Sequence, residues 1–201
     1  MSFGKMIREL ATGAALLCAA PAFAEGPVNI THDVPSVMVP TESGPVEISR
    51  IQDNENELWG EWSRTSRACP PFCIQPMNAV DGVHVIGELE VLEMLQDPEA
   101  LVIDSRYVSN YQGGTIPGAV NIPYNQVTDS LEMLGCVPDF DIYDCSEAKP
   151  VALFCNGPWC GQSPSAARFM IAAGYPPELI SLYRGGMQVW RMLGLTVITP
   201  E

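Results

Sequence analysis

Positive charge is scarce in this chain. Its 201 residues include 10 Lys and Arg against 24 Asp and Glu, and the formal net charge is −14 at pH 7. A surface of this sign repels phosphate backbones and anionic lipid headgroups. We therefore expect no nucleic acid and no anionic membrane surface among the partners of this protein.

Histidine is also rare, and the cysteines lack the spacing of a zinc site. There are only two histidines, His32 and His84, and both lie far from the cysteines in sequence. No Cys-x-x-Cys pair occurs. Structural zinc needs four such ligands at short, regular spacing. The sequence therefore predicts no metal site and points to no cofactor.

A long apolar run is missing, although a short one lies near the N-terminus. Lys5 and Arg8 precede the apolar residues 11–20, and Ala22-Phe23-Ala24 follows. This order is typical of a secretory signal with a small-residue cleavage site, and the apolar run is too short to span a bilayer comfortably. We interpret residues 1–24 as a signal peptide. The mature protein would then be periplasmic or secreted, with no membrane attachment.

Six cysteines follow the signal segment, an even number that permits disulfides in an exported protein. Their order suggests three local pairs, although six cysteines allow about fifteen pairings. Cys136 and Cys145 flank an acidic loop, and a bridge closing it would contribute about 2–3 kcal/mol. A bridge across Cys-Pro-Pro-Phe-Cys would be strained, so we expect those two cysteines to be free or paired elsewhere. The six are Cys69, Cys73, Cys136, Cys145, Cys155 and Cys160.

The remaining chain divides near residue 83. Residues 25–82 are rich in proline and include Trp59 and Trp62, so we interpret them as an extension packed on the main domain, with both tryptophans docked. Residues 83–199 alternate short apolar runs with helical stretches. This alternation predicts an α/β domain with a mostly parallel sheet. We expect strands at 84–86, 100–104, 118–124, 151–155 and 179–185, and helices at 87–98, 164–174 and 187–195.

Two of the predicted helices carry specific expectations. Leu89, Leu92 and Leu95 recur at a spacing of three and predict the buried face of the first helix. Ser163 is predicted to cap the second helix, with Pro164 at its first position.

The segment Cys-Asn-Gly-Pro-Trp-Cys-Gly-Gln-Ser follows the apolar run of residues 151–154. In parallel sheets, ligands bind at the carboxyl ends of strands, where Cys155 is predicted to lie. Backbone amides and the positive end of the following helix stabilise a thiolate there. A thiol whose pKa is lowered becomes a nucleophile near neutral pH. Cys155 is therefore the candidate nucleophile, with an inert buried cysteine as the alternative.

At this point the chain resembles the rhodanese, or sulfurtransferase, family over about residues 83–199. The similar segments are LVIDSR at 101–106, GGTIPGAVNIPY at 113–124, and LYRGGMQVWRMLGLTV at 182–197. Thr115 stands where the family usually has histidine. The resemblance implies a sheet of about five strands flanked by helices on both faces.

The resemblance also implies roles for individual residues. The family carries sulfane sulfur as a persulfide on the cysteine that opens its active loop, which by position is Cys155. The supporting residues would be Asp104, Arg106 and Arg184, with a structural ion pair as the alternative role for Asp104 and Arg106. From Cys155 to Gln162 the loop has eight residues where the family usually has six, and it holds no Lys or Arg. The residues that would bind sulfur and substrate are Asn156, Gly157, Pro158, Trp159, Cys160, Gly161, Gln162 and Ser163.

Three functions remain open on this reading. The first is sulfur transfer through Cys155, with a small sulfur-containing donor or a thiol acceptor, possibly on a protein, as partner. The second is thiol–disulfide exchange by Cys155 and Cys160, or release of sulfide from a Cys155 persulfide by Cys160. The third is a non-catalytic binding module, which the acidic surface and the absence of a loop cation permit.

Overall fold

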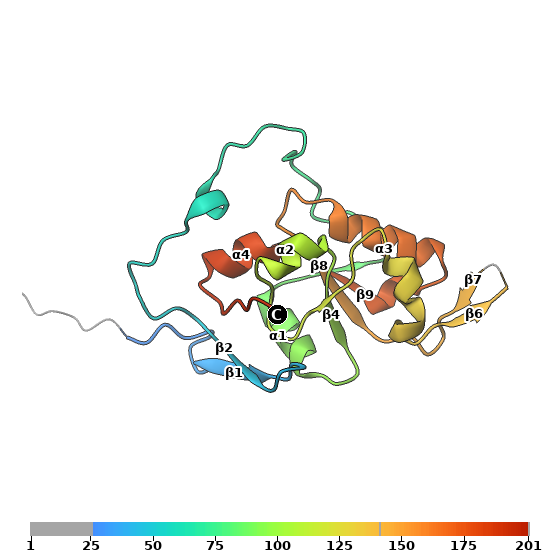
Figure 1. Cartoon of the computed structure of the whole chain (residues 1–201), viewed down its shortest axis with the longest axis horizontal. Coiled ribbons are helices and arrows are strands. Elements are labelled where there is room, and N and C mark those ends of the chain that lie inside the picture. The colour runs from blue at the N-terminus through green and yellow to red at the C-terminus, as the bar shows by residue number, and fades with distance from the viewer. Residues whose placement is uncertain (1–25, 141, 201) are drawn as a thin grey trace, which may run out of the picture.

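The computed structural model describes residues 26–140 and 142–200. The predicted signal segment lies outside these residues. The core is a five-stranded sheet in the order β3-β9-β8-β4-β5 (Figure 1), and every pairing in it is parallel. The fold is therefore the predicted α/β class. The strands are β3 (His84–Ile86), β4 (Leu101–Asp104), β5 (Val120–Asn121), β8 (Val151–Phe154) and β9 (Ile180–Tyr183).

Helices cover both faces of this sheet. One face packs against α1 (Glu88–Gln96) and α4 (Gly186–Met192), and the other against α3 (Gln162–Ala172) and the 3-10 helix η2 (Val127–Leu134). Alternate residues of β8 serve the two faces: Val151 and Leu153 join the α3 core, whereas Ala152 and Phe154 join the α1 core. A strand buried on both sides needs a continuous apolar run, and this is why the run 151–154 was recognisable in the sequence. The short elements α2 (Val108–Gln112), η1 (Gly60–Ser63) and η3 (Pro177–Leu179) lie in the connections.

The buried face of α1 differs from the prediction. Leu92 and Leu95 are buried as expected, but Leu89 is 49% exposed. Val91 takes its place in the core at 0% exposure. The reason is the helical period of 3.6 residues. Around the helix axis, residues 91, 92 and 95 lie within a narrower arc than residues 89, 92 and 95. Among the described residues, no helix is long and apolar enough to cross a membrane.

The extension begins with an antiparallel hairpin formed by β1 (Ser36–Val39) and β2 (Val46–Ser49). Val39 and Ile48 insert into the α1 core and are almost fully buried. The end of β2 also pairs with the C-terminal segment, where the Ile51 amide donates to the Gly194 carbonyl at 2.8 Å and the Thr196 amide to the Ser49 carbonyl at 3.0 Å. The hairpin and the C-terminal segment therefore close one side of the domain together.

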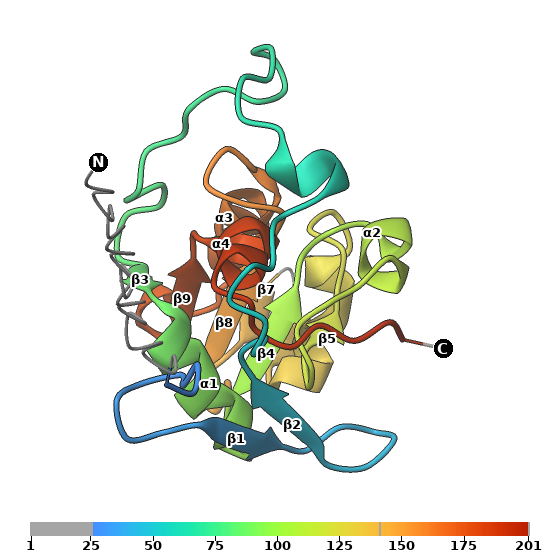
Figure 2. The same ribbon diagram turned by 90° about the vertical axis from the view of Figure 1, so that its left-hand side faces the viewer.

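After the hairpin, the extension arches over the end of the domain that carries α4 and the start of α3 (Figures 1 and 2). The prediction that both tryptophans dock is half wrong. Trp62 packs against the α1 core, whereas Trp59 is 78% exposed. The Gln188 side-chain amide of α4 donates to the Trp62 carbonyl at 2.7 Å, which fixes the arch to the domain.

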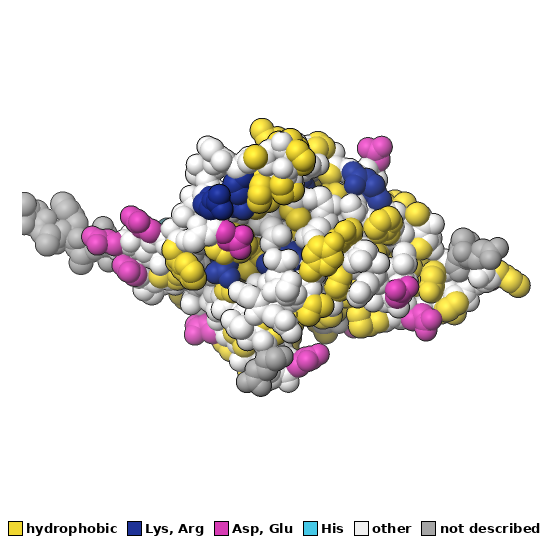
Figure 3. Space-filling model, turned by 45° about the horizontal axis from the view of Figure 1, so that its top comes forward, with side chains coloured by type: hydrophobic (Ala, Val, Ile, Leu, Met, Phe, Trp, Pro, Cys, Tyr) yellow, Lys and Arg dark blue, Asp and Glu magenta, His cyan; other side chains and the backbone are white. Residues whose placement is uncertain are grey.

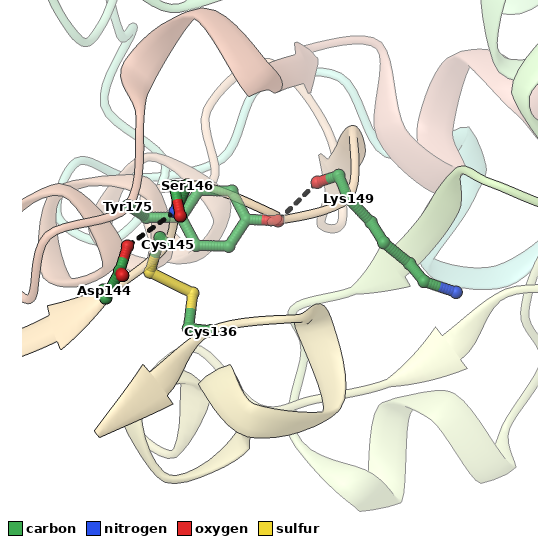
Figure 4. The surroundings of a disulfide bond; sticks show 6 residues. All are labelled: Cys136, Asp144, Cys145, Ser146, Lys149 and Tyr175. Carbon is green, nitrogen blue, oxygen red and sulfur yellow. Dashed lines mark hydrogen bonds between the residues drawn. A yellow bond between two sulfur atoms is a disulfide. The ribbon is translucent and has the colours of Figure 1, made fainter. Parts of the chain in front are cut away.

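Two of the three suggested cysteine pairs are disulfides. Cys136 and Cys145 are joined beside the hairpin of β6 (Val137–Asp139) and β7 (Ile142–Asp144), with both sulfurs in the α3 core (Figure 4). Cys69 and Cys73 are also joined, so the expectation that they are free or paired elsewhere is wrong. The Phe72 amide donates to the Ala68 carbonyl at 3.2 Å and closes the turn, and this brings the two Cα atoms to 4.5 Å. The third pair, Cys155 and Cys160, consists of two free thiols.

Candidate active site

The segment 155–161 connects β8 to α3 at the carboxyl edge of the sheet. Because β8 lies between β4 and β9, the residues that follow those two strands surround this loop. They are the Asp104–Arg106 segment after β4 and Arg184 after β9. This is the edge at which parallel sheets bind ligands.

The N-terminus of α4 holds the start of the loop. The Met187 amide donates to the Cys155 carbonyl at 3.0 Å, and the Gln188 amide donates to the Asn156 carbonyl at 2.9 Å. The approach requires glycine at position 186, because a Cβ there would stand 2.3 Å from the Cys155 carbonyl oxygen and the backbone φ is +54°. Gly186 therefore permits the close contact between α4 and the loop that carries the candidate nucleophile.

Cys155 is 2% exposed, and its sulfur is surrounded by hydrogen-bonding groups. The Ser163 hydroxyl donates to Cys155 Sγ at 3.3 Å. Burial raises the pKa of this thiol, but hydrogen bonds from the Cys160 thiol, the Ser163 hydroxyl and amide, and the Gly157 amide favour the thiolate and lower the pKa to about 6. A cysteine with this pKa is mostly thiolate at neutral pH, as a nucleophile requires.

Ser163 therefore has a role different from the predicted one. The helix begins two residues earlier than expected, at Gln162, with Gly161 at the cap position and no side-chain cap. Ser163 lies in the first turn and is fully buried, and its hydroxyl turns toward the sulfur of Cys155. A serine directly before proline is typical of a helix cap, and the sequence alone does not distinguish this role from a hydrogen bond to the Cys155 thiolate.

Cys160 faces the same sulfur from the other end of the loop. Its amide donates to the Gly157 carbonyl at 2.8 Å, which closes the turn that contains Pro158. Its one thiol proton has two acceptors, the Cys155 sulfur and Gln162 Oε1 at 3.4 Å. The interaction with Cys155, followed by burial, raises the pKa of the Cys160 thiol. The pair is therefore asymmetric, with Cys155 as the thiolate and Cys160 as the protonated donor.

This asymmetry predicts different effects of two substitutions at position 160. Cys160→Ala removes one donor to the thiolate, and a hydrogen bond to a charged group contributes about 1.5–3 kcal/mol. We expect the pKa of Cys155 to rise by about 1 to 2, so its alkylation by iodoacetamide would need a higher pH. Cys160→Ser keeps a donor, and we expect a smaller rise. Alkylation rates measured from pH 4 to 9 (about this range brackets the Cys155 thiol in the parent and in both variants) would test this, and identical midpoints for the alanine variant and the parent would contradict it.

Arg184 supports the outer part of the loop. It is 2% exposed, and it donates through Nη1 to the Cys160 carbonyl at 3.0 Å and through Nη2 to the Pro158 carbonyl at 2.7 Å. Two of its three guanidinium nitrogens thus donate to loop carbonyls, whereas Nε is buried without a hydrogen-bond partner among the described residues. We assign it a positioning role, in which it fixes the turn that presents Cys160 to Cys155.

Asp104 and Arg106 form a buried ion pair. The carboxylate accepts from Nε of Arg106 at 2.8 Å and from Nη2 at 2.6 Å, and it also accepts from the Thr115 hydroxyl at 2.8 Å. Arg106 Nη1 lies 3.5 Å from Oδ1 of Asn156, the second residue of the loop. Thr115 is therefore part of this hydrogen-bond network, and the Asp104–Arg106 ion pair links Thr115 to Asn156 of the loop.

The extension adds residues that the sequence did not indicate. The guanidinium of Arg67 lies 4.4 Å from the ring centroid of Phe72 and 4.6 Å from that of Trp159. Trp159 in turn covers Gly157, where a Cβ would meet the indole at 2.6 Å. The one available signal was the pair of arginines at 64 and 67 in a strongly acidic chain, but nothing in the sequence placed them beside the loop. Pro158 and Gly161 are exposed, and Gln162 Oε1 lies 3.4 Å from Cys160 Sγ.

One family model matches this chain. Residues 89–193, more than half of the chain, match the family described as Rhodanese: Rhodanese-like domain. An HTH-type transcriptional regulator of Mycobacterium tuberculosis is 30% identical over 112 residues, which are 56% of this chain and 43% of that protein. The chain thus spans less than half the length of this curated relative.

Solved structures of similar proteins include two with names that refer to the same family. A thiosulfate sulfurtransferase from Pseudomonas aeruginosa is 22% identical, with a TM-score of 0.45, over 62% of this chain and 22% of that one. A rhodanese-related protein from Thermoplasma volcanium is 21% identical, with a TM-score of 0.44, over 58% of this chain and 99% of that one. The match to residues 89–193 includes both the loop and the Asp104–Arg106 pair. This chain therefore belongs to the rhodanese-like domain family.

Proposed function

We propose that this protein is an exported sulfurtransferase that carries sulfane sulfur as a persulfide on Cys155. The observation that carries the proposal is the thiol of Cys155, which has a pKa lowered to about 6 and is surrounded by donors from one loop and one helix turn. Family membership is consistent with this chemistry. The signal-like N-terminal segment and the two disulfides support a periplasmic or secreted location.

The reaction would occur in two steps that balance. In the first, the Cys155 thiolate attacks the outer sulfur of a donor R–S–S⁻. The donor sulfur–sulfur bond breaks, R–S⁻ leaves with its electron pair, and Cys155 becomes Cys–S–S⁻. In the second step, a nucleophilic acceptor attacks the outer sulfur, takes it, and releases the Cys155 thiolate. The same donors that stabilise the resting thiolate would stabilise the negative outer sulfur of the persulfide.

The partner would be a small sulfur-containing donor and a thiol or similar nucleophilic acceptor. No metal or cofactor is required by this scheme. The dithiol alternative is less well supported, because Cys155 and Cys160 are both free thiols and because Cys160 holds its proton. A thiol that holds its proton is a poor attacking group in disulfide exchange.

Intact-mass spectrometry of the mature protein tests the proposal. After incubation with thiosulfate or with glutathione persulfide, the protein should gain the mass of one sulfur atom, and peptide mapping should place it on Cys155. Cyanide should remove this sulfur as thiocyanate and restore the original mass. Absence of the mass gain with both donors, or a gain at another residue, would contradict the proposal.

A further inference from the structure

A cavity of about 230 Å³ lies between the extension and the loop. The loop contributes one wall through Pro158 and Trp159, and the extension contributes the others. Two arginines, two polar side chains and two apolar side chains of the extension line it, and these are Arg64, Thr65, Arg67, Phe72, Ile74 and Gln75. The cavity therefore exists only because the extension arches over the loop (Figures 1 and 2).

The guanidinium of Arg67 is held in place within this wall. It lies over both Phe72 and Trp159, with ring centroids 4.4 Å and 4.6 Å away, and the two rings contact each other with centroids 5.8 Å apart. Its Nη2 donates to the Glu61 carbonyl at 3.0 Å. The Cys69–Cys73 disulfide fixes the turn from which Phe72 reaches the arginine. A stacked guanidinium loses little conformational freedom when it binds an anion, so it is well prepared for that role.

Neither arginine of this cavity is neutralised by a carboxylate. Within the described residues, the ion pairs are His32–Asp33 and Arg106–Asp104, and neither involves Arg64 or Arg67. Figure 3 shows Lys and Arg side chains lying among hydrophobic ones across the upper part of this face. The extension thus provides the positive charge that residues 155–163 lack.

We propose that Arg64 and Arg67 bind the carboxylate of a small organic persulfide while its outer sulfur reaches Cys155. This inference rests on the sulfur transfer proposed above and names the class of donor. Cys155 is buried and does not line the cavity, whereas Pro158 and Trp159 do. The charged group of the donor must therefore be separated from its reactive sulfur by a spacer. Thiosulfate has no such spacer, but a peptide-sized persulfide with a carboxylate does.

Steady-state kinetics with two donors test this inference. Glutathione persulfide carries two carboxylates, and thiosulfate serves as the donor without a spacer. We expect Arg64→Gln to raise KM for glutathione persulfide about fivefold, because an exposed charge pair contributes up to about 1 kcal/mol. The double variant with Arg67→Gln should raise KM further. The single variant Arg64→Gln should leave kcat/KM for thiosulfate within about twofold of the parent.

Lys149→Gln is the matched control. It also removes one positive charge, but Lys149 precedes β8 at the opposite edge of the sheet, and its side chain points away from the disulfide region (Figure 4). We expect this variant to behave like the parent with both donors. An equal effect of Lys149→Gln would show that net charge alone matters, and it would overturn the proposed site.

A binding measurement separates this site from the sulfur chemistry. Cys155→Ser protein would be titrated with S-methylglutathione, which has the same carboxylates but cannot donate sulfur. Calorimetric binding that is lost in the double arginine variant would support the site even if no persulfide formed in the turnover experiment. Equal binding by both proteins would overturn it. An acidic peptide that bound while S-methylglutathione did not would also overturn it, and would assign the surface to a protein partner.

Discussion

Replacing Cys155 by serine is expected to abolish sulfur transfer, with a loss of at least about a thousandfold in kcat/KM for any sulfane donor. The serine oxygen would occupy the same place, between the Ser163 hydroxyl and the Cys160 carbonyl. A hydroxyl is nevertheless almost fully protonated at neutral pH, and it forms no stable bond to sulfane sulfur. The measurement is thiocyanate formation from thiosulfate and cyanide, together with intact mass after donor treatment.

The matched control is Cys160→Ser, which makes the same atomic change in the same loop. Cys160 holds its proton and donates to Cys155, so a serine there should retain most of the turnover and should still gain one sulfur. Equal losses in the two variants would mean that the thiols act as a pair, and the single-nucleophile mechanism would be wrong. Activity that survived Cys155→Ser would also contradict the assignment.

Asp104→Ala is expected to lower the free energy of unfolding by about 3–5 kcal/mol, because it leaves a buried guanidinium without its counterion. Asp104 is 0% exposed and Arg106 is 1% exposed, and the carboxylate also accepts the Thr115 hydroxyl. Loss of stability on this scale would remove a large fraction of the total for a domain of this size. The measurement is urea unfolding followed by tryptophan fluorescence.

Two further variants make this prediction specific. Asp33→Ala breaks the His32–Asp33 pair, both members of which are almost fully exposed, and it should leave the unfolding midpoint unchanged. Replacing Asp104 by leucine and Arg106 by methionine together should recover part of the lost stability, because no buried charge then remains unpaired. A double variant as unstable as Asp104→Ala would indicate that Arg106 stabilises the fold mainly through its contacts with Gly114 and Asn156.

The sequence predicted the central part of the fold well, and the reason is burial. A strand covered by helices on both faces must be apolar throughout, so the runs Leu-Val-Ile and Val-Ala-Leu-Phe predict β4 and β8. Helix α1 was also predicted, with Leu92 and Leu95 correctly buried, but Val91 is buried in place of Leu89 because a strict spacing of three ignores the helical period of 3.6 residues. The extension was the least predictable part, because its contacts join residues more than a hundred positions apart, such as Trp62 and Gln188.

The candidate site was predicted in its chemistry but not in its geometry. The position of Cys155 after an apolar run and before a helix was sufficient to nominate it. The orientation of Ser163 and the protonated state of Cys160 depend on the conformation of the loop. The N-terminus of α4 holds this loop through two hydrogen bonds. It lies about thirty residues further along the chain, the usual length of one α/β unit. The roles of Arg67 and Phe72 depend on a turn closed by Cys69 and Cys73, which we expected to be free or paired elsewhere.

The pairing of the β2 end with the C-terminal segment has a consequence for how this protein can be dissected. The family match covers residues 89–193, but Val39 and Ile48 complete the core over α1, and Ser49 bonds Thr196. A fragment trimmed to the family boundaries would carry an uncovered apolar face, the kind of surface that promotes aggregation. The boundaries of the family match therefore differ from those of the folding unit, and a fragment designed to fold with its active loop intact would have to begin at the β1–β2 hairpin.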